Sequence, residues 1–190
     1  MQMIRSLRNL TVAVGIAVVC VASAARVDAA GRFPYAAVVK ADGAEFRSGP
    51  GEGYYATSVA KAGLAIEVYH EDGDWSAVRP PAGSHCWVAA KHVKLPATLR
   101  FQEGVDLASP VAVEIVAENV GAFIGSEVSD DRDAVAVRLK VGERVWILSA
   151  EQAGGQTWIK IAPPSGEFRW IETKLIRAVA KQAEPAEEPQ

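Results

Sequence analysis

The chain has 190 residues, of which 49% are hydrophobic and 23% charged, and its formal net charge at pH 7 is −3. This composition is typical of a chain that folds around apolar cores rather than of a disordered one. It lacks the basic stripe with which proteins bind nucleic acid, so we exclude that class of partner.

The N-terminus has the pattern of a secretory signal peptide. Arg5 and Arg8 form a positively charged start, and residues 10–22 are almost all apolar. This run is shorter than the ~20 residues that a membrane-spanning helix needs, so we favour a cleaved signal over an uncleaved anchor. Residues 22–24 and 27–29 both suit signal peptidase, and we expect cleavage after the second.

The two cysteines of the chain give little scope for covalent linkage. Val19, which precedes Cys20, is not the small residue that lipid attachment requires, so we disfavour a lipid anchor. After cleavage Cys86 is alone, and no disulfide can form within the mature chain. We therefore expect an exported protein, in the periplasm, in the cell envelope or secreted, with no stable membrane span and with cores held by packing alone.

Short β-strands are expected along the rest of the chain. Apolar and polar residues alternate with a period of two at 65–69 and 158–161, a pattern that predicts strands. The Gly-, Asp- and Pro-rich segments 71–74 and 80–83 are turn signals between neighbouring antiparallel strands. No helix longer than about a turn is predicted.

An internal repeat organises these strands. Residues 75–93 recur 83 residues later as 158–176, with tryptophan, proline and glycine positions kept and valine exchanged for isoleucine. Further upstream, 39–46 parallels 116–123. The repeat predicts two copies of one small domain.

Each copy has about 60 residues and about five short strands, which suits a small closed barrel without exposed edges. We expect Trp75, Trp87, Trp158 and Trp170 to fill the barrels, because a small core needs large side chains. The expected organisation is a signal peptide (1–29), a first barrel (33–94), a linker partly packed on a barrel (95–110), a second, divergent barrel (111–177) and a disordered tail (178–190).

The motifs of the first copy resemble a known family. Residues 46–54 (FRSGPGEGY) are similar to the opening of the bacterial SH3-like (SH3b) domain, and segments 60–63, 73–78 and 83–88 resemble its later landmarks in the same order. Cys86 stands where that family usually has glycine. The resemblance implies an all-β fold of two SH3-like barrels in tandem, and a groove of the kind that the family uses for short peptides, including cell-wall cross-bridges.

The second copy departs from the family pattern in its first loop, where residues 124–128 read IGSEV. The resemblance therefore places peptide binding in the first copy. There the loop would form one wall of a groove and two tyrosines its floor, since tyrosine offers a flat apolar face and a hydroxyl. The candidate ligand-binding residues are Arg47, Ser48, Pro50, Tyr54, Tyr55, Trp75 and Trp87. The alternative is that the loop only turns the chain and that the tryptophans belong to the core.

Catalysis and metal binding are not expected. Cys86 and His85 are neighbours on a predicted strand and should point to opposite faces, and His92 lies near the end of that strand, so no thiol–base pair is predicted. With His70, these histidines lack the spacing of metal ligands. The acidic residues in 130–133 lack the glycine turn and distal glutamate of a calcium loop. We expect no enzyme, no cofactor and no bound metal.

The function that these observations predict is that of an exported, non-catalytic binding module. Its expected ligand is a peptidoglycan peptide or an extended protein segment. The alternative is a structural subunit of an envelope protein assembly with no small ligand, which would meet its partner through exposed apolar residues such as Trp146 or Phe168.

Overall fold

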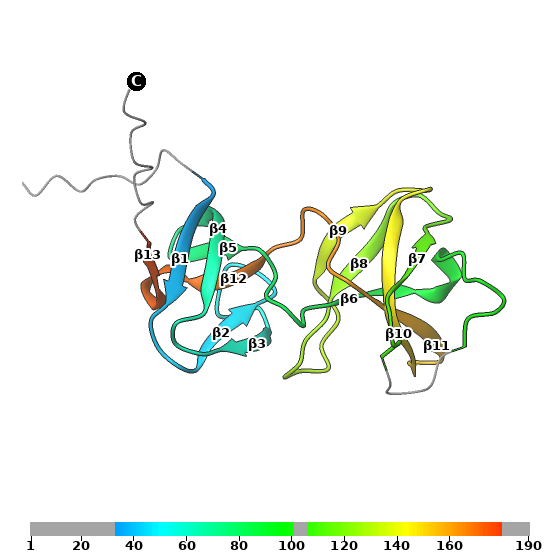
Figure 1. Ribbon diagram of the computed structural model, residues 1–190, viewed down its shortest axis with the longest axis horizontal. Helices are drawn as coiled ribbons and strands as arrows, with labels where there is room; N and C mark the ends of the chain where they lie inside the picture. The colour runs from blue at the N-terminus through cyan, green and yellow to red at the C-terminus, as the bar shows by residue number, and fades with distance from the viewer. Residues whose placement is uncertain (1–32, 101–105, 180–190) are drawn as a thin grey trace, which may run out of the picture. The chain divides into compact units, whose positions relative to one another are not determined.

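A computed structural model describes residues 33–100 and 106–179, and Figure 1 shows them as an all-β fold with two antiparallel sheets. The only helical elements among these residues are two single 3₁₀ turns, η1 (Ala90–His92) and η2 (Thr173–Leu175). None of the described helices is long and apolar enough to cross a membrane. The predicted signal peptide (1–29) and residues 180–190 of the predicted disordered tail (178–190) lie outside the described residues, whereas Ala178 of that tail ends a strand.

The first sheet has seven strands in the order β13-β1-β4-β5-β12-β2-β3, and every neighbouring pair is antiparallel. Their bounds are β1 (Tyr35–Val39), β2 (Ala44–Arg47), β3 (Ala56–Ala60), β4 (Ala65–Asp72), β5 (Trp75–Val78), β12 (Arg169–Glu172) and β13 (Ile176–Ala178).

The second sheet has six strands in the order β7-β10-β11-β6-β8-β9, again antiparallel. Their bounds are β6 (Cys86–Ala89), β7 (Val111–Glu114), β8 (Val120–Ile124), β9 (Val135–Leu139), β10 (Arg144–Ala153) and β11 (Gln156–Ile161). A bridge between Val93 and Ile115 continues the pairing beyond β6.

The two sequence repeats exchange strands. Strand β6 belongs to the first repeat but lies between β11 and β8, and β12 belongs to the second repeat but lies between β5 and β2. In Figure 1 the orange β12 accordingly sits among blue and cyan strands, and the green β6 lies with yellow ones. The sheets therefore do not follow the ranges 33–94 and 111–177, because each contains strands of both repeats.

The exchanged strands occupy equivalent places in the two sheets. Trp87 of β6 pairs with Lys160 and Phe123, while Trp170 of β12 pairs with Ala77 and Arg47. Each strand thus uses the same register in the sheet of the other repeat.

The register corrects the upstream part of the repeat alignment by one residue. Val39 pairs with Ile176. Val93 is the repeat equivalent of Ile176, and it bridges Ile115 rather than Val116. Val39 therefore corresponds to Ile115. Since a shift of one residue turns a strand's side chains to the other face, buried Phe46 corresponds to buried Ala122 and not to Phe123.

Aliphatic side chains fill both cores. The first core is built from Val39, Val68, Val78, Ile171 and similar residues around Phe46, and the second is a larger cluster of valine, isoleucine and leucine. The expectation that tryptophans fill the interior is wrong for Trp75, Trp158 and Trp170. Trp75, Trp158 and Trp170 are half-buried, Trp146 is 54% exposed, and buried Trp87 belongs to neither cluster. Branched aliphatic residues fill these narrow interiors, and the indole rings lie on the outer faces.

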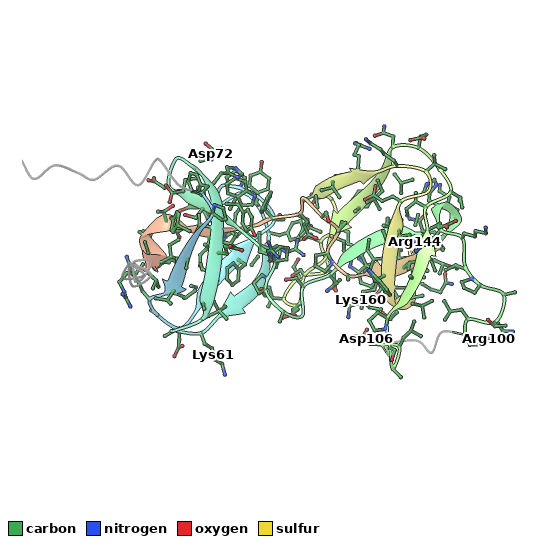
Figure 2. The ribbon with its side chains drawn as sticks, turned by 45° about the horizontal axis from the view of Figure 1, so that its top comes forward. Lys61, Asp72, Arg100, Asp106, Arg144 and Lys160 are labelled. Atoms are coloured by element: carbon green, nitrogen blue, oxygen red, sulfur yellow. The ribbon has the colours of Figure 1, made fainter. Side chains whose placement is uncertain are left out.

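The described ends of the segment 95–110 pack on the second core. Leu99 and Leu107 contact that core, and the Leu107 backbone N–H donates to the carbonyl of Leu148. Next to it the Lys160 ammonium binds the Asp106 carboxylate at 3.1 Å, which Figure 2 shows with both residues labelled.

Candidate functional site: an outer aromatic face of the first sheet

A row of paired residues crosses the outer face of the first sheet. His70 of β4 is opposite Ala77 of β5, Ala77 is opposite Trp170 of β12, and Trp170 is opposite Arg47 of β2. Directly paired residues of antiparallel strands share a face. Since Ala77 is small and fully buried, the rings of His70 and Trp170 meet edge to face, with centroids 4.9 Å apart.

Two further rings extend this row. The ring of Phe168 lies 5.3 Å from that of Tyr69 and 5.9 Å from that of His70. We call Tyr69, His70, Phe168 and Trp170 the aromatic face. His70 is exposed and the other three are half-buried. Two of the rings come from each repeat, so the strand exchange brings them together.

Arg79 borders the aromatic face. Its guanidinium lies 5.2 Å from the centroid of the Tyr69 ring and donates to the Tyr69 hydroxyl. A cation over an aromatic ring is attracted to the ring's negative face. The Arg79 side chain is 69% exposed, so it also offers N–H donors to an incoming acceptor.

A groove of about 550 Å³ adjoins the aromatic face. Its walls are the two connections that lead into the exchanged strands, 79–84 and 163–168, and Tyr69. These connections carry equivalent proline pairs, Pro80-Pro81 and Pro163-Pro164. We call this hollow the proline groove. Aromatic surfaces are typical linings of grooves that hold extended peptides.

The predicted binding loop of the first repeat (47–54) is stabilised mainly by contacts among residues 45–54. Arg47 donates to the carbonyls of Glu52 (3.1 Å) and Tyr54 (2.6 Å) and pairs with Glu45 (2.5 Å). Ser48 is buried, Pro50 is half-buried, and the exposed ring of Tyr54 covers Gly49. Arg47, Ser48, Pro50 and Tyr54 therefore lie in one braced turn, and Arg47 links this turn to Trp170.

Tyr55 has a different role from Tyr54. Its hydroxyl donates to the carbonyl of Ile124, at 2.7 Å. Burial raises the pKa of Tyr55 to about 12, with the Arg169 charge acting in the opposite direction. The Tyr55 hydroxyl is thus engaged with a strand of the second sheet, while Tyr54 covers its own loop.

The two predicted tryptophans lie in different sheets. Trp75 is opposite Glu172 at the start of β5, two residues before Ala77 and on the same face as the aromatic row. Trp87 is in the second sheet and does not join the predicted loop. Arg132, from the acidic segment of the second repeat, covers its ring at 4.3 Å from the centroid. Trp87 is therefore 7% exposed, whereas its repeat equivalent Trp170 is only half-buried.

A charged pocket of about 310 Å³ lies beside Trp87, and its lining includes His85, Arg132, Glu151 and Lys160. The cations are paired with carboxylates: Arg132 with Glu151, and Lys160 with Asp106. Burial, reinforced by the charge of Lys160, lowers the pKa of His85 to about 4. His85 is consequently neutral at pH 7, and its ring packs edge-on against Trp87.

A buried polar cluster marks the point where the two exchanged strands begin. The Cys86 thiol donates to Glu167 Oε2 at 2.9 Å. Arg169 faces Glu167 Oε1 as an ion pair at 2.6 Å and donates to the His85 carbonyl at 2.9 Å. We call Cys86, Glu167 and Arg169 the crossing cluster. Sequence reasoning missed Glu167 and Arg169; the available signal was the repeat, which aligns Arg169 with Cys86.

The crossing cluster does not favour nucleophilic chemistry. Burial and the Glu167 charge raise the pKa of the Cys86 thiol far above neutrality, and the thiolate is the reactive form. Burial also raises the pKa of Glu167, with Arg169 acting in the opposite direction. In the described part of the chain no group of three or more His, Cys, Asp or Glu side chains is placed to hold a metal ion.

No family model, curated protein or solved structure matches this chain.

Proposed function

We propose that this chain is an exported, non-catalytic binding protein of two small SH3-like β-barrels, and that its aromatic face binds an extended peptide of the cell wall. The motif resemblance in residues 46–88 and the two separate aliphatic cores support the SH3-like arrangement. The single observation that carries the binding role is the cluster of half-buried rings from both repeats beside the proline groove.

The chemistry of this surface suits a chain more than a compact molecule. Tyr69, Phe168 and Trp170 give flat contact area, which binds apolar side chains at a low cost in side-chain entropy. The proline groove continues the surface along the two connections, so a ligand several residues long would contact both. Arg79 supplies charge-assisted hydrogen bonds to a carboxylate of the ligand, a group that cell-wall peptides carry.

Peptidoglycan sedimentation and fluorescence titration with a synthetic cell-wall peptide test this proposal. Trp170→Ala and Phe168→Ala should each weaken binding at least tenfold, which corresponds to about 1.4 kcal/mol. Trp146→Ala is the matched control, because Trp146 is more exposed than Trp170 but lies in the second sheet. The proposal fails if the wild-type protein does not bind, or if Trp170→Ala binds as well as wild type.

A second candidate function is that of a structural subunit in an envelope protein assembly. The observation in its favour is Trp146 on β10, which is 54% exposed, because tryptophan is enriched in protein interfaces relative to the rest of the surface. Trp146→Glu would then abolish co-purification of a defined envelope partner and leave peptidoglycan sedimentation unchanged. The opposite pattern would favour the peptide-binding role.

A further inference from the structure

Strand pairing alone does not decide which repeat receives which strand. Cys86 of β6 is opposite Ile161 and Ile124, and Arg169 of β12 is opposite Val78. Positions 86 and 169 are equivalent in the repeat, so β6 and β12 could return to their own repeats with the same register. An interaction other than the backbone pairing of strands must therefore favour the exchanged arrangement.

The crossing cluster differs between these two arrangements. In the exchanged form Arg169 has the carboxylate of Glu167 and the carbonyl of His85 as partners, and Cys86 donates to the same carboxylate. If β12 returned to the second sheet, Arg169 would take the place of Cys86 between two buried isoleucines, without these contacts from β6. Glu167 would move with Arg169, but the hydrogen bonds to the His85 carbonyl and from the Cys86 thiol would be lost. A buried ion pair that loses its additional hydrogen bonds is disfavoured.

The proline pairs act in the same direction. The residue before a proline is restricted to extended conformations, and the two connections hold Pro80-Pro81 and Pro163-Pro164. Such connections favour a strand that continues away from its own sheet over one that folds straight back. The proline pairs are the same in both repeats, however, so they promote the exchange of strands but do not by themselves stabilise the exchanged arrangement.

We infer that the buried Glu167–Arg169 pair, closed by Cys86, selects the exchanged arrangement of β6 and β12 and so assembles the aromatic face. Glu167 and Arg169 are then positioning residues for the binding role, a part of the inference that rests on the proposed function. Two of the four rings reach the first sheet only on the exchanged segment 168–170. Buried polar groups have precedent as specificity devices, since a single buried asparagine can fix the register of a coiled coil.

Disulfide trapping in the full chain, with Cys20→Ser as background, reads the arrangement directly. Ile161→Cys places a thiol opposite Cys86 in the exchanged form, whereas Val78→Cys would face Cys86 only if β6 returned to its own repeat. Directly opposite strand residues are within reach of a disulfide. After mild oxidation, peptide mapping of the monomer should give the 86–161 bond with Ile161→Cys and no 86–78 bond with Val78→Cys.

The decisive variant is Glu167→Leu with Arg169→Met, which removes both charges and keeps apolar volume. Here the 86–78 bond should appear with Val78→Cys, and the yield of the 86–161 bond should fall at least twofold. Unchanged trapping yields would overturn the inference, as would an 86–78 bond in the background protein. If this variant does not fold, Glu167→Gln with Arg169→Gln is read by the same two bonds.

The trapping yields involve no ligand, so they separate this inference from the proposed function. Suppose that the double variant changes the disulfide yields but the wild-type protein binds no peptide. This result would support the role of Glu167 and Arg169 in selecting the strand arrangement and would overturn the proposed peptide binding. Peptide binding by the wild type together with unchanged disulfide yields in the double variant would support the binding role and overturn the inference about the charge pair.

Discussion

Cys86 and Arg169 occupy the same position in the two sequence repeats, and both contact the carboxylate of Glu167. The thiol sulfur lies 2.9 Å from one carboxylate oxygen and the guanidinium nitrogen 2.6 Å from the other. The side chains of Glu167 and Arg169 are 0% exposed. Two chain segments that are far apart in the sequence thus meet at one buried charge pair.

Arg169→Met should destabilise the protein by about 3–5 kcal/mol, because it leaves the Glu167 carboxylate buried without its partner. Glu167→Leu combined with Arg169→Met should recover most of this loss, because no buried charge then remains. Urea unfolding at pH 7 measures both free energies. A double variant no more stable than Arg169→Met would contradict this account of the pair.

Local sequence signals predict the all-β fold, because alternation with a period of two and Gly- and Pro-rich turns act over a few residues. They do not predict the strand exchange. Strands β6 and β12 carry nearly the same pattern, with Trp87 equivalent to Trp170 and Val88 equivalent to Ile171. Either strand therefore satisfies either sheet locally, and the choice depends on the contacts of Glu167 and Arg169 with Cys86 and His85 of the other repeat.

The candidate site was only partly predictable for the same reason. The resemblance singled out Arg47, which the structure places opposite Trp170. The aromatic face itself joins β4 to a segment of the other repeat, and no sequence spacing connects Tyr69 with Phe168. The wrong prediction for the tryptophans has another cause. Alternation of residue types shows that the two faces of a strand differ, but it does not show that the face with branched aliphatic residues is the inner one.

Arg132→Ala should uncover Trp87. The substitution removes the guanidinium over the indole ring and the partner of Glu151, and we expect a loss of about 1–2 kcal/mol in the free energy of unfolding. Acrylamide quenching of tryptophan fluorescence should increase. Arg138→Ala, on exposed β9 surface, is the control and should change neither quantity. Equal quenching of wild type and Arg132→Ala would show that the ring is covered by something else.

Gly49→Ala should destabilise the first loop by roughly 1–3 kcal/mol, because the added methyl group would overlap the Tyr54 ring. Tyr54→Ala should relieve this overlap, so Gly49→Ala should cost much less in that background. Gly53→Ala is the matched control, since an added methyl group there meets nothing within 4 Å. Thermal unfolding of the wild type, Gly49→Ala, Tyr54→Ala and the double variant gives the coupling energy between positions 49 and 54. Additive effects of the two substitutions would argue against the contact.

His85 should make the protein less stable in mild acid. Its pKa is about 4 in the folded state, against about 6.5 in an unfolded chain. Below pH 6.5 the unfolded imidazole takes up a proton that the folded one does not bind. The free energy of unfolding should therefore fall as the pH drops from about 6.5 to about 4, by about 3 kcal/mol at most, and the His85 contribution should level off below that range.

Other carboxylates also titrate near pH 4, so the contribution of His85 must be isolated by a variant. His85→Phe introduces the residue found at the equivalent position 168 and removes the titration. Urea unfolding of both proteins at several pH values between 4 and 7 should give a difference that varies with pH only through His85. A constant difference across this range would mean that His85 keeps an ordinary affinity for protons in the folded state, and that its packing against Trp87 does not exclude the charged form.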